Sequence, residues 1–174
     1  MCHGCQVKKL ENNYAFIDIQ NLNLAIKSCG WKVDFRRFRI FLKEKYSIEK
    51  AYVFTGYLEE NEDIYHLLHY AGYVCVFKPV LFTSQGVVKG NCDGELILQA
   101  MIDYTNYDKA VVVTGDGDFY CLVKHLVEQN KLKVLFVPNR RSYSALLKHE
   151  IFKLYIYFVS DLREKLEYKK EKAP

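Results

Sequence analysis

The sequence is short of the features that define several protein classes. Three prolines and nine glycines in 174 residues are too few for a collagen-like or low-complexity chain. No apolar run approaches the ~20 residues that a membrane-spanning helix needs, so we expect no membrane partner. The first residues, MCHGCQVKKLENN, are polar and lack the apolar core of a signal peptide. We therefore expect a cytoplasmic protein.

The six cysteines show no disulfide framework. They are scattered along the chain, and without an export signal reduced thiols are expected. Cys2, His3 and Cys5 form a cluster of soft ligands, but the sequence offers no evident fourth ligand for zinc. Whether this cluster binds a metal stays open.

Strand-like and helix-like patterns alternate along the chain, which is 50% hydrophobic and 26% charged. Short runs rich in Val, Ile, Phe and Tyr predict strands at 14–19, 50–56, 73–80, 110–116 and 133–139. Apolar stripes predict helices at 34–46, 60–71, 93–105, 118–129 and, at the end of the chain, 150–168. This order predicts one α/β domain of three α/β/α layers, Rossmann-like, with a central, mainly parallel five-stranded sheet.

Acidic residues follow two of the predicted strands. Asp18 ends the first predicted strand, and Asn21 follows three residues later. The fourth predicted strand is followed by TGDGDF, which contains Thr114, Asp116 and Asp118. The carboxyl ends of parallel strands meet at one edge, where such sheets bind ligands. Neighbouring carboxylates raise each other's pKa or recruit a cation, and a hard divalent ion is the simplest. The alternative is a turn in which Asp118 only caps the next helix.

A third acidic segment is KGNCDG, in which Asp93 opens a predicted helix. Asp93 either complements the helix N-terminus or is a third carboxylate of the same pocket. Lys89 lies near it as a candidate phosphate contact. Asp103, ten residues further on, is about 80° off the Asp93 face of a regular helix, and we treat it as an outer candidate.

The segments FIDIQN, KGNCDG and TGDGDF resemble, in this order, the NYN domain of the PIN-like nucleases, in its LabA-like branch. The resemblance covers about 14–150, between a flexible N-terminal segment (1–13) and a C-terminal helix and tail (151–174). It implies a Mg²⁺- or Mn²⁺-dependent ribonuclease with one or two ions. By resemblance the metal-binding and catalytic acids are Asp18, Asp93, Asp116 and Asp118, with Asn21 and Thr114 supporting the pocket. Ile19 departs from the family pattern, which has Gly there, and Asn91-Cys92 with Gly94 surround the second acid.

Basic residues flank the acids and suit a nucleic-acid partner. Residues 27–50 carry eight basic and three acidic groups, and 131–153 carry six and one, a local +5 in each case. As substrate-binding candidates we take Lys78, Lys89, Arg140 and Arg141; the two arginines are equally well read as ordinary loop charges. We expect single-stranded or structured RNA as the partner.

Two alternatives stay open. The domain is either a nuclease or a catalytically weak RNA-binding or regulatory module that keeps the metal site, because acids alone do not separate the two. DNA is also an open substrate, because nothing in the sequence visibly reads a 2′-hydroxyl. The terminal stretch IFKLYIYFVSDL (151–162) is apolar on more than one face, and we expect it to cover the sheet or to contact a second copy in a homodimer.

Overall fold

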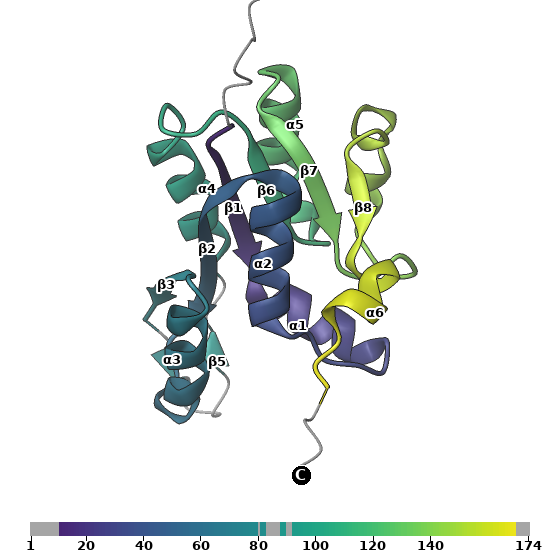
Figure 1. Cartoon of the computed structure of the whole chain (residues 1–174). Helices are drawn as coiled ribbons and strands as arrows, with labels where there is room; N and C mark the ends of the chain where they lie inside the picture. The colour runs from purple at the N-terminus through teal and green to yellow at the C-terminus, as the bar shows by residue number, and fades with distance from the viewer. Residues whose placement is uncertain (1–10, 80, 83–87, 90–91, 170–174) are drawn as a thin grey trace, which may run out of the picture.

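The protein is a mixed α/β domain built on a parallel sheet. The computed structural model describes residues 11–79, 81–82, 88–89 and 92–169. Within them the main sheet has the strand order β3-β2-β1-β6-β7-β8, and every neighbouring pair is parallel (Figure 1). The strands are β1 (Asn13–Asp18), β2 (Ile48–Gly56), β3 (Val74–Lys78), β6 (Ala110–Val113), β7 (Leu132–Val137) and β8 (Ile156–Phe158). The predicted fold class is confirmed, but the sheet has six strands rather than five.

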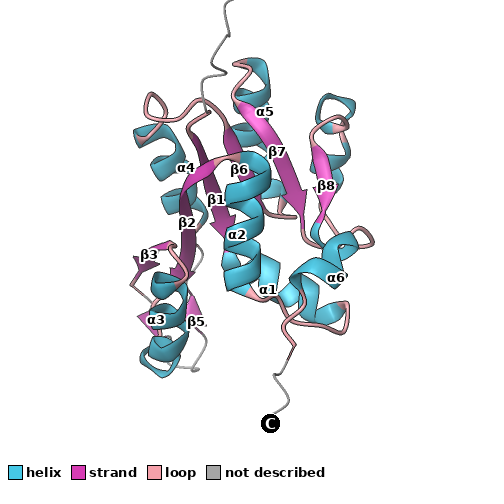
Figure 2. Cartoon of the chain, in the orientation of Figure 1, coloured by secondary structure: helices cyan, strands magenta, loops and turns pink. Residues whose placement is uncertain are grey.

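The sixth strand comes from the segment that the sequence predicted as a terminal helix. That prediction is wrong, because residues 150–168 are broken into the 3-10 turns Glu150–Phe152 and Val159–Leu162, strand β8 between them, and a single helical turn, α6 (Arg163–Leu166) (Figure 2). Aromatic and β-branched side chains favour extended backbone, and the open edge of β7 supplies hydrogen-bonding partners. The segment therefore extends the sheet. A homodimer contact stays a prediction.

Helices cover both faces of the sheet. One face carries α1 (Ile19–Ser28), α2 (Phe35–Tyr46), α3 (Glu62–Tyr70) and α6, and the other carries α4 (Asp93–Ile102) and α5 (Tyr120–Glu128) (Figure 1). The alternation of strand side chains produces the two cores. In β1, Ala15 and Ile17 pack into the first core, whereas Tyr14 and Phe16 pack into the second.

Helix α1 was missed by the sequence patterns. Its buried residues are Ile19, Leu22 and Ile26, separated by polar residues and exposed Leu24, so the apolar stripe is short. The helix begins because the Asp18 side chain caps it. A small antiparallel pair, β4 (Leu81–Phe82) with β5 (Val88–Lys89), lies outside the main sheet.

The strand order creates a switch point between β1 and β6. From β1 the chain builds β2 and β3 on one side, then crosses to β6 on the other side of β1. The carboxyl ends of β1 and β6 therefore flank the crevice in which open α/β sheets bind ligands. Asp18 and the TGDGDF segment lie at these two ends. No helix in the described part of the chain has the length and apolar character needed to span a membrane.

Candidate metal centre

Three carboxylates meet at the switch point. One oxygen each from Asp93, Asp116 and Asp118 lies within 4.8 Å of the other two. Asp93 is the first residue of α4, and the other two belong to the loop and 3-10 turn (Gly117–Phe119) that follow β6. Asp93 and Asp116 are half-buried, and Asp118 is exposed. The chain thus brings together two segments that are more than twenty residues apart in the sequence.

Short hydrogen bonds shape the loop after β6. The Asp116 backbone N–H donates to Thr114 Oγ1 at 3.1 Å, and the Asp118 N–H donates to Asp116 Oδ1 at 3.0 Å. Asp116 thereby caps the 3-10 turn while its second oxygen stays available. Thr114 itself is fully buried. These hydrogen bonds and the buried Thr114 therefore hold Asp116 and Asp118 in place within the loop.

Gly117 is required between these two aspartates by space rather than by backbone angle. A Cβ at this position would lie 2.3 Å from Ser144 Oγ and 3.1 Å from Ser144 Cβ. Ser144 begins the 3-10 turn Ala145–Lys148, and its N–H donates to the Gly115 carbonyl at 3.0 Å. The sequence signalled the glycines, but nothing in it identified Ser144 as the residue that packs against the loop.

Asp18 and Asn21 fasten the end of β1 to the same loop. Asp18 Oδ1 accepts the Asn21 N–H at 3.0 Å, and the Thr114 hydroxyl donates to Asp18 Oδ2 at 3.4 Å. Across the switch point the Gly115 N–H donates to Asn21 Oδ1 at 2.8 Å. Asn21 and Thr114 therefore hold the two strand ends together, and their role as supporting residues of the pocket stays a prediction.

The charge of Asp18 is held at an energetic disadvantage. Burial first, and then the neighbouring charges of Asp93 and Asp116, raise its pKa to about 6 against the opposing effect of the Asn21 N–H and the Thr114 hydroxyl. Asp18 is outside the group whose oxygens lie within 4.8 Å. The charges of Asp93 and Asp116, two members of that group, nevertheless raise the pKa of Asp18. All four aspartates therefore contribute to one region of negative potential.

This donor set fits a hard divalent cation. Every ligand atom is a carboxylate oxygen, the type that Mg²⁺, Mn²⁺ and Ca²⁺ prefer over the nitrogen and sulfur ligands of zinc. A cation there would also relieve the repulsion that raises the pKa of Asp18. The acids and their field therefore support a metal site, and they leave the identity of the ion open.

Asp103 does not join this cluster. It lies at the other end of α4, about 15 Å along the helix from Asp93. Its carboxylate accepts hydrogen bonds from Tyr52 Oη at 2.7 Å, Gln99 Nε2 at 2.8 Å and Asn106 Nδ2 at 3.0 Å. The expectation of an outer pocket residue is corrected accordingly, because Asp103 stabilises the end of α4.

The basic candidates are dispersed. Lys78, at the end of β3, pairs with Glu95 of α4 at 3.3 Å, beside the acids. Arg140 pairs with Asp161 instead of facing the aspartates, and Arg141 is exposed with its N–H donating to Asn139 Oδ1 at 2.9 Å. Lys89 lies in β5 opposite Leu81, and the placement of its side chain lies outside what the structure describes, as do Cys2, His3 and Cys5.

The fold and the acid cluster together define a nuclease-like α/β domain. A comparison with protein families matches residues 14–152 to the NYN domain. The chain belongs to the NYN domain family, within a nuclease-like superfamily whose members act on nucleic acids. This confirms the family that the three acidic segments indicated, and the LabA-like branch stays a prediction.

A solved structure shares the fold. It is the crystal structure of a protein of unknown function, VPA0982, from Vibrio parahaemolyticus RIMD 2210633, with a TM-score of 0.75 and 22% sequence identity. The alignment covers 92% of this chain and 99% of that one. No curated protein sequence matches the chain significantly. At this identity the likeness concerns the fold alone.

Proposed function

We propose that this NYN domain hydrolyses RNA phosphodiester bonds with Mg²⁺ or Mn²⁺ held by its aspartates. The observation that carries the proposal is the meeting of Asp93, Asp116 and Asp118 within 4.8 Å at the sheet's switch point. Placing three carboxylates so close together costs free energy, because their negative charges repel one another. Such clusters are therefore typical of active sites. The family membership points to the same class of activity.

The four aspartates divide two tasks in this proposal. Asp93, Asp116 and Asp118 hold one or two cations, and Asp18 supplies negative charge from the end of β1. When bound, a hard divalent ion lowers the pKa of water and neutralises charge that develops on a phosphodiester. Thr114 and Asn21 keep the acids in register, because they bond to both strand ends.

The charge distribution around the acids suits a polyanionic substrate. The four aspartates repel phosphate unless a cation is bound, so a bound metal ion strengthens the attraction of the acidic site for the substrate. Lys78 pairs with Glu95 in α4's acidic first turn and keeps a side-chain exposure of 37%. We assign RNA rather than DNA from the family, as an expectation that the assay must test.

The test is a cleavage assay on RNA and DNA in single-stranded, hairpin and duplex forms, with Mg²⁺, Mn²⁺ or EDTA. We expect cleavage of RNA with either ion, none with EDTA, and none by the Asp116→Asn variant. Cleavage that survives EDTA or Asp116→Asn would overturn the proposal. A melting temperature that rises with Mg²⁺ or Mn²⁺, without cleavage of any nucleic acid, would establish the alternative of a regulatory module.

A further inference from the structure

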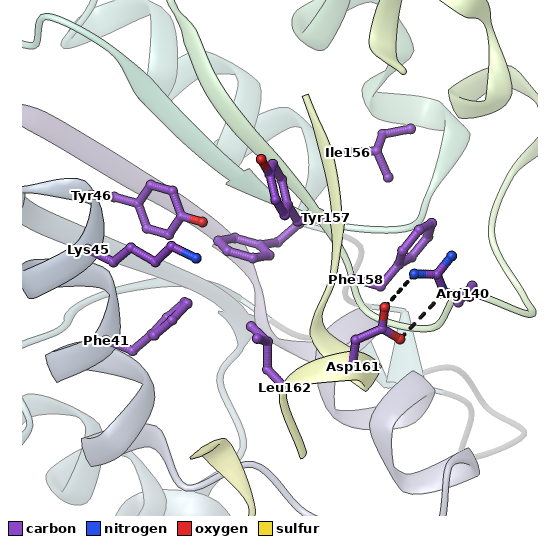
Figure 3. Close-up of a pocket in the computed structure, with 10 residues that line it drawn as sticks. Phe41, Lys45, Tyr46, Arg140, Ile156, Tyr157, Phe158, Asp161 and Leu162 are labelled. Carbon is purple, nitrogen blue, oxygen red and sulfur yellow. Dashed lines mark hydrogen bonds and ion pairs between the residues drawn. The ribbon is translucent and has the colours of Figure 1, made fainter. Parts of the chain in front are cut away.

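A second, separate cavity lies between α2 and the strand β8 with the turn that follows it (Figure 3). Its volume is about 320 Å³. Five of its lining residues are aromatic: Phe41, Tyr46, Phe136, Tyr157 and Phe158. No sequence pattern pointed to it, because β8 was predicted as helix.

The cavity contains a polar atom without a partner. Tyr46 is 7% exposed, and its hydroxyl makes no hydrogen bond with any residue in the described part of the chain. The hydroxyl is nevertheless accessible, since every fully buried side-chain polar atom among the described residues has a partner. Figure 3 shows it pointing into the cavity. An accessible hydroxyl on an otherwise buried ring is free to bond to a ligand in the cavity.

The cavity also contains an uncompensated positive charge. Lys45 Nζ lies over the rings of Phe41 and Tyr46, 5.5 Å from each centroid, and 6.0 Å from that of Tyr157. Across the described residues no carboxylate pairs with it. Arg140, at the far side, is paired with Asp161 and stacks on Phe158 at 4.2 Å (Figure 3). The opposite charges of Arg140 and Asp161 cancel each other, so the charge of Lys45 is the one that can attract an anion to the cavity.

The loop after β7 connects this cavity to the aspartates. Pro138 and Tyr143 lie against Gly115, within 3.6 Å of the place where its Cβ would be. Arg140, two residues from Pro138 and thus within roughly 7 Å along the chain, lines the cavity. The Tyr143 ring also packs edge-on against Phe158 at 5.8 Å. One extended strand a few nucleotides long would therefore reach both places.

We propose that this cavity binds one unstacked nucleobase of a single-stranded RNA whose backbone continues to the aspartates. Aromatic walls stack with a base of any identity, the Tyr46 hydroxyl bonds to its edge, and Lys45 attracts the adjoining phosphate. The volume suits one base and is near the lower limit of small-molecule pockets. A duplex keeps its bases paired, so the cavity selects single strands. This inference rests on the proposed function for its substrate.

The experiment measures binding in EDTA, where no cleavage takes place. A fluorescein-labelled single-stranded RNA of about 12 nucleotides and its duplex are titrated with wild type, Lys45→Ala and Tyr157→Ala by anisotropy. Both variants should weaken single-strand binding about 5- to 10-fold, and Tyr46→Phe, which deletes only the hydroxyl, about threefold. Lys43→Ala is the matched control, because Lys43 is an exposed cation of α2 outside the cavity.

Two results would overturn the inference. One is an equal effect of Lys45→Ala and Lys43→Ala with no effect of Tyr157→Ala, which indicates general electrostatic attraction. The other is a loss of duplex binding as large as the loss of single-strand binding. Thermal melts show whether each variant is folded, and Tyr46→Phe keeps the test valid if the alanine variants are not. If Asp116→Asn fails to stop cleavage while the cavity variants behave as expected, the metal mechanism fails and the base site stands.

Discussion

Asp18 and Asp103 are both poorly exposed aspartates, and their surroundings are opposite. Asp103 receives three side-chain hydrogen bonds, which outweigh the effect of burial and hold its pKa below the ordinary value. Asp18 receives one backbone N–H and one long hydroxyl contact, and burial beside Asp93 and Asp116 raises its pKa to about 6. Burial therefore does not mark a functional acid. The shortage of donors does, because it leaves a charge for a ligand to satisfy.

The largest difference between the acidic cluster and the surroundings of Asp103 is expected in the rate of RNA cleavage. Asp116→Asn keeps the size and capping capacity of the side chain but removes a charge from the metal centre. We expect RNA cleavage to fall by about 1,000-fold or more. Asp103→Asn removes a charge of equal sign at the other end of α4 and should leave the rate within about threefold of wild type.

Initial cleavage rates at saturating Mg²⁺, measured below the melting temperature of each variant, decide this comparison. Similar losses in both variants would mean that the activity follows fold stability rather than the acid cluster. Calorimetric titration of Mn²⁺ provides a second readout, in which only Asp116→Asn should weaken binding.

The placement of the acids is the next target. Gly117→Ala puts a methyl group 2.3 Å from Ser144 Oγ and 3.1 Å from Ser144 Cβ, so Ser144 or the turn that carries Asp118 must shift, and we expect the turn to move. A displacement near 1 Å at reacting groups lowers rates by about 100-fold. Gly94→Ala is the matched control, because a Cβ there meets nothing within 4 Å. Cleavage assays should show the loss only in Gly117→Ala, and equal rates in the two variants would refute the steric account.

For Asp103, the expected effect of a substitution is on the stability of the fold. Asp103→Ala removes the acceptor for Tyr52, Gln99 and Asn106, and the buried Tyr52 hydroxyl loses its partner. We expect the free energy of unfolding to fall by about 2–3 kcal/mol. Urea denaturation measures it, with Asp108→Ala as the control, since Asp108 is an exposed acid. A change under about 0.5 kcal/mol would show that the network contributes little.

Most of the main sheet could be predicted from the sequence, because continuous apolar runs such as 110–113 are typical of buried parallel strands. Asp18, Asp116 and Asp118 could be placed at one edge because they follow such strands, whereas Asp93, which opens α4, was assigned to the same pocket only by the family resemblance. Strand β8 could not be predicted, because IFKLYIYF fits either a helix or a strand until the open edge of β7 is known. The environment of Asp103 was equally hidden. Its partner Tyr52 is 51 residues away, and no local pattern shows that contact.

The opposite behaviour of Asp18 gives the last and smallest expected effect. Its pKa of about 6 in the folded protein exceeds the ordinary 3.8, so ionisation destabilises the metal-free fold. Stability attributable to this group is present at low pH and is lost as the pH rises from about 4 through 6.

Asp18→Asn removes this charge but keeps a good helix cap. In EDTA at pH 7.5 the variant should therefore be more stable than wild type by about 1–2 kcal/mol, and the difference should shrink below pH 4. Added Mg²⁺ should stabilise wild type more than the variant, because the cation offsets the repulsion among the acids. Urea melts across this pH range measure both effects. A variant that is less stable at every pH would show that Asp18 resembles Asp103 and serves the fold alone.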